Sequence, residues 1–166
     1  ASMNPSPSGF FNDPDSPQTS SPHEMQRYLN KISGPLLDRI DIHIEVTPVP
    51  FEKLSDDRKA ESSVAIRERV TKAREIQSRR FETHESINYN AQMSTKLIRE
   101  FCKLDETSLQ LLKTAMDRLN LSARAYDRIL KVSRTIADLD NSNEITSSHI
   151  AEAIQYRSLD RDGWLG

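Results

Sequence analysis

Residues 105–139 read DETSLQLLKTAMDRLNLSARAYDRILKVSRTIADL, and this stretch decides the fold. It contains no glycine or proline, and Asp105 and Ser122 each stand where a side chain can cap the start of a helix. After each cap, apolar residues recur at intervals of three and four, which is the period of one helical face. They are Leu109, Leu112, Met116 and Leu119 in the first run, and Ala125, Ile129, Val132, Ile136 and Leu139 in the second. The stretch therefore predicts two amphipathic helices.

The segments around this pair extend the helical pattern. A long helix is expected over residues 60–81, which contain no glycine or proline, and a short helix over residues 94–102. Thr146 is placed to open a last helix that carries Ile150 and Ala153. Short amphipathic helices joined by loops of a few residues form a bundle, so the predicted fold class is mainly α.

The first third of the chain has a different pattern. Residues 1–22 are rich in proline and serine, which is typical of a loop. Ser21 and Glu24 can then form a capping box for a helix that stops before a Gly-Pro pair. Residues 40–46 alternate apolar and polar side chains, which predicts a single strand with His43 on its polar side.

Composition excludes several classes of protein. Of the 166 residues 29% are charged, the net charge is -2, and no apolar run is long enough for a transmembrane helix. The four glycines form neither a Walker-type phosphate loop nor a dinucleotide-binding turn. The one cysteine, Cys102, is expected to be a buried residue of a chain in a reducing, cytoplasmic compartment. No two of the four histidines have the spacing of paired metal ligands, so no metal site is predicted.

Basic residues raise two questions about function. The long helix carries Arg67, Arg69, Lys72, Arg74, Arg79 and Arg80. Acids interleave with them, which fits either a solvated face with ion pairs or a surface that contacts phosphates or a neighbouring subunit. Arg39 lies between an apolar turn and the expected strand, and Arg124 lies in the first turn of a helix, where the helix dipole disfavours a cation. Neither position is explained by the local pattern.

Five stretches carry a resemblance to a known family. They are SMNPSPSG at residues 2–9, YLNKISGPLLDRIDIHIEV at residues 28–46, ESSVAIRERVTKAREIQSRRF at residues 61–81, LDETSLQLLKTAMDRLNLSARAYDRILKVSRTIADLD at residues 104–140, and SSHIAEAIQYRSLDR at residues 147–161. The chain resembles the magnesium-chelatase-like branch of the AAA+ ATPases, and within it the competence-related ComM or YifB group. The resemblance implies the C-terminal part of a longer ATPase, whose Walker motifs would lie before Ala1.

The same resemblance implies a division of the chain. Residues 1–50 would be the remnant of an α/β AAA+ core, with the sensor 1 loop, an arginine-finger helix and one strand. Residues 51–93 would be the long helix with its connecting loop, and residues 94–166 the helical lid.

The resemblance also implies roles for three residues. Asn4 matches the sensor 1 asparagine, which orients the attacking water. Arg39 matches the arginine finger, which reaches ATP held by an adjacent subunit, and Arg124 matches the sensor 2 arginine of the lid. A guanidinium fork suits the charge on the γ-phosphate oxygens. Asp38 and Asp41 would either brace Arg39 in the empty state or form a plain surface pair.

The function implied by the resemblance is that of an ATP-driven ring, expected to be a hexamer that acts on DNA in branch migration, recombination and natural transformation. ATP and Mg²⁺ would bind the full-length protein, whereas this chain alone is expected to be inactive, to hold no cofactor and to bind no membrane. Two alternatives stay open. One is the ATPase subunit of a magnesium chelatase, and the other is a non-catalytic helical module that binds DNA or protein.

One departure from the family pattern concerns the loop after MNP. Many members carry cysteines there in an arrangement that resembles a zinc knuckle, whereas this chain has Ser6, Ser8 and hydroxyl residues at 19–21. Serine hydroxyls do not replace thiolates as zinc ligands, so no zinc is predicted.

Overall fold

The computed structural model describes residues 1–4, 6, 21–29, 31–44, 46, 49 and 60–157. In these ranges the elements are α1 (Pro22–Leu29), α2 (Gly34–Leu37), α4 (Ser63–Arg80), the 3-10 turn η1 (Asn90–Gln92), α5 (Thr95–Phe101), α6 (Glu106–Arg118), α7 (Ala123–Leu139) and α8 (Ser147–Gln155). The mainly α prediction is confirmed. None of the described helices is long and apolar enough to cross a membrane.

The bundle helices begin at the predicted caps. The Asp105 carboxylate and the Ser122 hydroxyl each accept a backbone N–H of the first turn, at 2.7 and 3.2 Å. At the start of α8 the imidazole of His149 takes the place of the usual carboxylate, because its Nδ1 accepts the backbone N–H of Thr146 at 3.0 Å. Local cap chemistry therefore sets these three boundaries.

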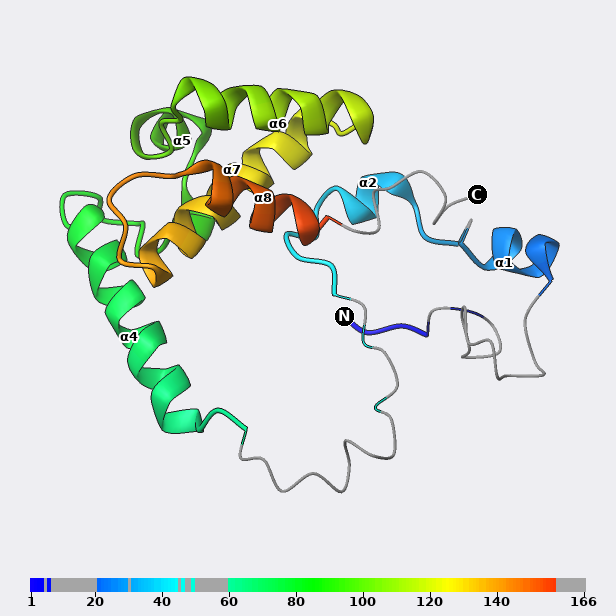
Figure 1. Ribbon diagram of the computed structural model, residues 1–166, viewed down its shortest axis with the longest axis horizontal. Helices are drawn as coiled ribbons and strands as arrows, with labels where there is room; N and C mark the ends of the chain where they lie inside the picture. Colours follow the sequence, from blue (N-terminus) through cyan, green and yellow to red (C-terminus); the bar gives the residue numbers. More distant parts are fainter. Residues whose placement is uncertain are drawn as a thin grey trace.

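Helix α7 is the central element of the bundle. It packs against α4, η1, α5 and α8, and α6 lies on α8 (Figure 1). Ile129 and Ile136 on its predicted face are buried, whereas Leu139 is 38% exposed. Because neighbours lie on several sides of α7, it also buries the charged side chains of Arg134 and Asp138.

A buried polar cluster joins the end of α4 to α7. The Asp138 carboxylate accepts from both Arg80 Nη atoms, one of them at 2.7 Å, from Arg134 Nε at 3.2 Å and from Asn90 Nδ2 at 2.7 Å. A buried carboxylate is costly unless donors surround it, and here a cation comes from each helix. The cluster therefore fixes the last turn of α4 to the bundle. This connection was not predicted from the sequence.

Helix α4 packs along only part of its length. Figure 1 shows its first turns extending away from the bundle. Ile66 and Val70, which the helical period places on one face with Ala73, are 41% and 45% exposed, whereas Ala73 and Phe81 are buried. The helix itself is predicted from sequence, but the extent of its burial is not.

Residues 40–44 and 46 form no strand, so the strand prediction is wrong. The expected exposure is also reversed, because Ile44 is 71% exposed while His43 is 5% exposed. A strand needs a hydrogen-bonded neighbour. Here the backbone N–H of His43 donates instead to the carbonyl of Tyr156, just after α8, at 2.7 Å. Apolar and polar residues do alternate in this segment, but the alternation does not show which part of the chain the segment contacts.

Candidate functional site

Arg39 lies in the turn that follows the short helix α2. The backbone N–H groups of Leu36 and Leu37 donate to the carbonyl of Ser33 at 2.9 and 3.2 Å, and Arg39 N–H donates to the carbonyl of Leu36 at 3.0 Å. Leu37 is 4% exposed and anchors the turn. Arg39 itself is exposed, so its guanidinium is free to meet a group outside this chain.

Arg39 pairs with no acidic side chain among the described residues, so of the two alternatives for Asp38 and Asp41 the brace of Arg39 is not found there. Asp41 forms an ion pair with Arg128 of α7, at 2.8 Å between Oδ1 and Nη1. Both side chains are about one-third exposed, at 37% and 32%. This pair does not hold Arg39, but it holds the segment that follows Arg39 against α7.

Arg124 lies in the first turn of α7, next to the Ser122 cap, and is exposed. In the described part of the chain it too has no acidic partner. Arg128, which pairs with Asp41, is four residues further along α7 and hence on the same face, one turn away. The structure therefore brings the segment of Arg39 to the face of α7 that carries Arg124.

Asn4 stands apart from both arginines. It is exposed, and its backbone carbonyl accepts a hydrogen bond from the hydroxyl of Tyr28, on α1, at 2.8 Å. No hydrogen bond or ion pair among the described residues joins Asn4 to Arg39 or Arg124.

The loop that departs from the family's cysteine pattern is only partly described. Ser6 is 1% exposed, whereas Ser8 and residues 19–20 lie outside the described residues. In the described ranges no three His, Cys, Asp or Glu side chains gather as metal ligands would.

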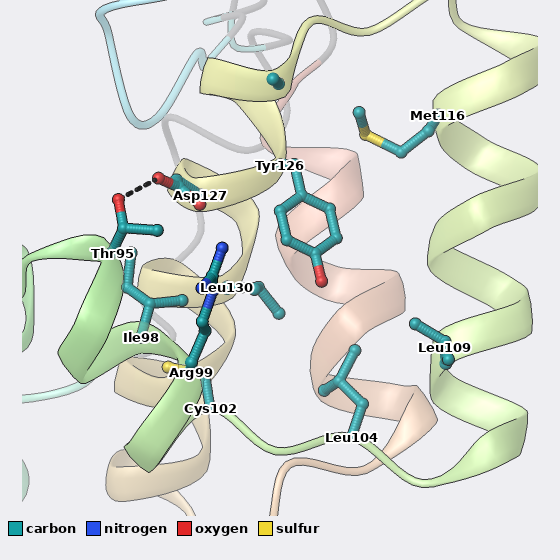
Figure 2. A pocket seen from close by; sticks show the side chains of 11 residues that line it. Thr95, Ile98, Arg99, Cys102, Leu104, Leu109, Met116, Tyr126, Asp127 and Leu130 are labelled. Carbon is teal, nitrogen blue, oxygen red and sulfur yellow. Dashed lines mark hydrogen bonds between the residues drawn. The ribbon is translucent and has the colours of Figure 1, made fainter.

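A groove of about 780 Å³ lies between α5, α6 and α7, beside the first turn of α7. Figure 2 shows an apolar part, with Leu109 and Met116 of α6, and a polar part, where the hydroxyl of Thr95 donates to the carboxylate of Asp127 at 3.4 Å. Arg99 extends along this polar part in the same view. Leu109, which lies on the predicted apolar face of α6, is 50% exposed on the wall of the groove.

Cys102 and His149 are both buried in the bundle. Cys102 is 5% exposed, as predicted, and its burial raises the pKa of the thiol to about 12. His149 is buried, and its Nε2 lies 3.1 Å from the Asp140 carboxylate. These side chains serve the packing of the bundle.

Four of the six basic residues of α4 already have a partner in this chain. Arg69 pairs with Glu61 at 2.6 Å, the Arg74 guanidinium lies 4.7 Å from the ring centroid of Tyr89, and Arg80 binds Asp138. The Nε of Arg79 donates to the backbone carbonyl of Glu75, one turn earlier, at 3.4 Å. The solvated, ion-paired reading therefore describes part of this helix, and the surface open to phosphates is smaller than the sequence suggested.

Sequence reasoning missed residues that hold the bundle and the candidate site together. Arg134 and Asp138 stand four residues apart on one helix face, a spacing that could have revealed their pairing. Asp41 and Arg128 are far apart in the sequence, and no local signal joins them.

Comparison with known proteins identifies the class and then the family. The profile of the magnesium chelatase subunit ChlI matches residues 1–54, and that of the ChlI C-terminal domain matches residues 60–157. These matches define the class as magnesium-chelatase-like AAA+ proteins. Within this class, the chain belongs to the magnesium chelatase ChlI family.

Individual curated proteins show which members of this family the chain resembles. The competence protein ComM of Haemophilus influenzae is 45% identical over 163 residues, which are 97% of this chain and 30% of the relative. The YifB protein of Escherichia coli K12 is 42% identical over 162 residues, 97% of this chain and 31% of the relative. The protein Mb2921c of Mycobacterium bovis is 35% identical over 132 residues, 80% of this chain and 26% of the relative. The chain thus spans less than a third of the length of these relatives.

Proposed function

We propose that this chain supplies the arginine finger and the lid of an ATP-hydrolysing ring, and that Arg39 acts on ATP bound by the neighbouring protomer. One observation carries the proposal. Arg39 is exposed, whereas Leu37, two residues before it in the same turn, is buried and anchors that turn. Arg124 is assigned to the phosphates as sensor 2, and Asn4 to the attacking water as sensor 1. Residues 1–50, 51–93 and 94–166 are the core remnant, the connecting helix and the lid.

The chemistry of phosphoryl transfer supports these roles. Negative charge spreads over the γ-phosphate oxygens in the transition state, and bound Mg²⁺ neutralises part of it. A guanidinium presents fixed donors that match this charge, and its contribution grows where water is excluded. Because Arg39 and Arg124 have no acidic partner among the described residues, both guanidinium groups are available without breaking an ion pair first.

We further propose DNA as the substrate on which the ring acts. The support is the similarity to a protein named for competence. The exposed basic side chains of α4 that have no acidic partner in the described ranges, such as Arg67 and Lys72, add a surface for phosphates.

The second candidate function is insertion of magnesium into a tetrapyrrole, and it is favoured by the description of the matching family. That activity requires a partner subunit with a metal-binding domain. Neighbouring tetrapyrrole genes would support it, and neighbouring DNA-processing genes would oppose it. A non-catalytic helical module is the third reading, and it is excluded if the reading frame also encodes a phosphate loop.

The direct test is Arg39→Ala in the full-length protein. We expect the rate of ATP turnover to fall about 10³- to 10⁵-fold, because a finger acts on the transition state. Binding of a fluorescent ATP analogue should change little, because the phosphate loop of the same protomer is untouched. Arg118→Ala, an exposed arginine in the last turn of α6, is the matched control. Normal turnover in Arg39→Ala would remove the finger assignment.

A further inference from the structure

Arg157 is a completely buried arginine just after α8, and it binds the turn that carries Arg39. Its exposed fraction is 0%. Its Nη1 donates to the backbone carbonyl of Ile40, and its Nη2 donates to the backbone carbonyl of Leu37 at 3.4 Å. The two acceptors are separated from Arg157 by 117 and 120 residues of chain.

These two carbonyls lie on either side of Arg39. Leu37 is two residues before it and Ile40 is one residue after it, and the Ile40 N–H donates to the Leu37 carbonyl at 3.0 Å. One guanidinium therefore holds both ends of the turn from inside the molecule, while Arg39 points outward. The fork geometry matters here, because an ammonium group cannot present two parallel donors at fixed positions.

Two more contacts hold the same segment against the lid. The His43 N–H donates to the carbonyl of Tyr156, the residue before Arg157, at 2.7 Å. Asp41 forms its ion pair with Arg128, one turn along α7 from Arg124. The turn of Arg39 and the residues after it are thus attached to α7 and to the residues just after α8.

From these contacts we infer that Arg157 is a positioning residue for ATP hydrolysis, which holds the turn of Arg39 to the lid. This inference rests on the proposed function. As a consequence, Arg39 and Arg124 move as one body, so that any rotation of the lid also changes the reach of the finger. Arg157 touches neither ATP nor the reacting atoms, and it acts only through Arg39.

The experiment compares Arg157→Lys with Arg118→Lys in the full-length protein. Lysine keeps the charge but loses the fork, so the turn of Arg39 is expected to shift rather than to unfold. We expect kcat for ATP to fall about 10- to 100-fold, since a displacement of about 1 Å at a catalytic group has effects of this size. The KM for ATP should stay within a factor of about three, because the finger acts on the transition state. Arg118→Lys should match the wild type.

A second measurement separates positioning from a general structural role. Single-turnover rates are compared for Arg39→Ala and for Arg39→Ala with Arg157→Lys. If Arg157 acts through Arg39, the second substitution has no further effect. A further loss of rate in the double variant, or unchanged kcat in Arg157→Lys, would overturn the inference.

Two results distinguish a failure of this inference from a failure of the proposed function. Normal turnover in Arg39→Ala removes both. A loss of turnover in Arg39→Ala with unchanged kcat in Arg157→Lys removes only the role of Arg157. Should Arg157→Lys fail to fold, Asp41→Asn tests the same attachment through its ion pair with Arg128. It should lower kcat without changing the KM for ATP, and an unchanged kcat there would count against the inference.

Discussion

At the scale of single residues, the bundle depends on charges that its helices bury. Asp138 is 1% exposed and receives donors from Arg80, Arg134 and Asn90. Arg80 and Arg134 are themselves mostly buried, with side chains 12% and 3% exposed. Removal of the one carboxylate would leave two largely buried cations without a counter-charge, which is more costly than the loss of the hydrogen bonds alone.

Asp138→Asn should therefore lower the free energy of unfolding by about 3 to 5 kcal/mol, the usual cost of breaking a buried ion pair on one side. Urea denaturation followed by circular dichroism measures the difference. Asp117→Asn, an exposed carboxylate of α6, should stay within about 0.5 kcal/mol of the wild type. Equal effects of the two substitutions would show that the cluster contributes little.

The buried thiol of Cys102 predicts a dependence of stability on pH. Its pKa is raised from 9.0 to about 12, with burial as the main cause. Between these values the unfolded chain loses a proton that the folded chain keeps, so the free energy of unfolding falls as the pH rises. The slope from this group is at most about 1.4 kcal/mol per pH unit. Because tyrosines and lysines titrate in the same range, the quantity to measure is the difference between the wild type and Cys102→Ala. Identical slopes in the two proteins would contradict the assignment.

At the scale of elements, what could be predicted from the sequence was local. The caps at Asp105, Ser122 and Thr146 were readable because each depends on residues only a few positions away. The segment at residues 40–46 was misread as a strand because its partner, Tyr156, is more than 100 residues distant. The spacing of apolar residues shows which residues share one face of an element, but it does not show which part of the chain covers that face.

The two halves of helix α4 differ in how well they are packed against the bundle, and this difference predicts different rates of amide hydrogen exchange. Its first turns carry exposed Ile66 and Val70, whereas its last turns bury Ala73 and Gln77 and are fixed by Arg80. Amide hydrogen exchange in this chain, measured by mass spectrometry, should therefore be faster over residues 63–70 than over residues 73–80. Substitution of Asp138 by asparagine should reduce that contrast, since it releases the last turn. Uniform protection along α4 would contradict this account.

At the scale of the whole molecule, only part of the candidate site could be predicted from the sequence. The positions of Arg39 and Arg124 were identified by resemblance, and both are exposed in the structure. The attachment that joins their segments, through Arg157 and the Asp41–Arg128 pair, joins residues remote in the sequence and needed the fold. A site assembled from distant segments leaves no spacing signal, unlike a motif within one helix.

The proposal that Arg39 acts across a subunit boundary makes a prediction that only an assembled ring can satisfy. One full-length variant carries Arg39→Ala, and a second lacks the phosphate-loop lysine, which lies outside this chain. Each alone should be inactive, but in a mixture the second variant can lend its Arg39 to the intact ATP site of the first. Random mixing in equal amounts should restore up to about a quarter of wild-type turnover, because half of the sites are intact and half of their neighbours carry the finger. The control mixes the lysine variant with a double variant that lacks both groups, and it should stay inactive. Failure of the first mixture to recover turnover, with both variants shown to assemble together, would place Arg39 outside the site of its neighbour.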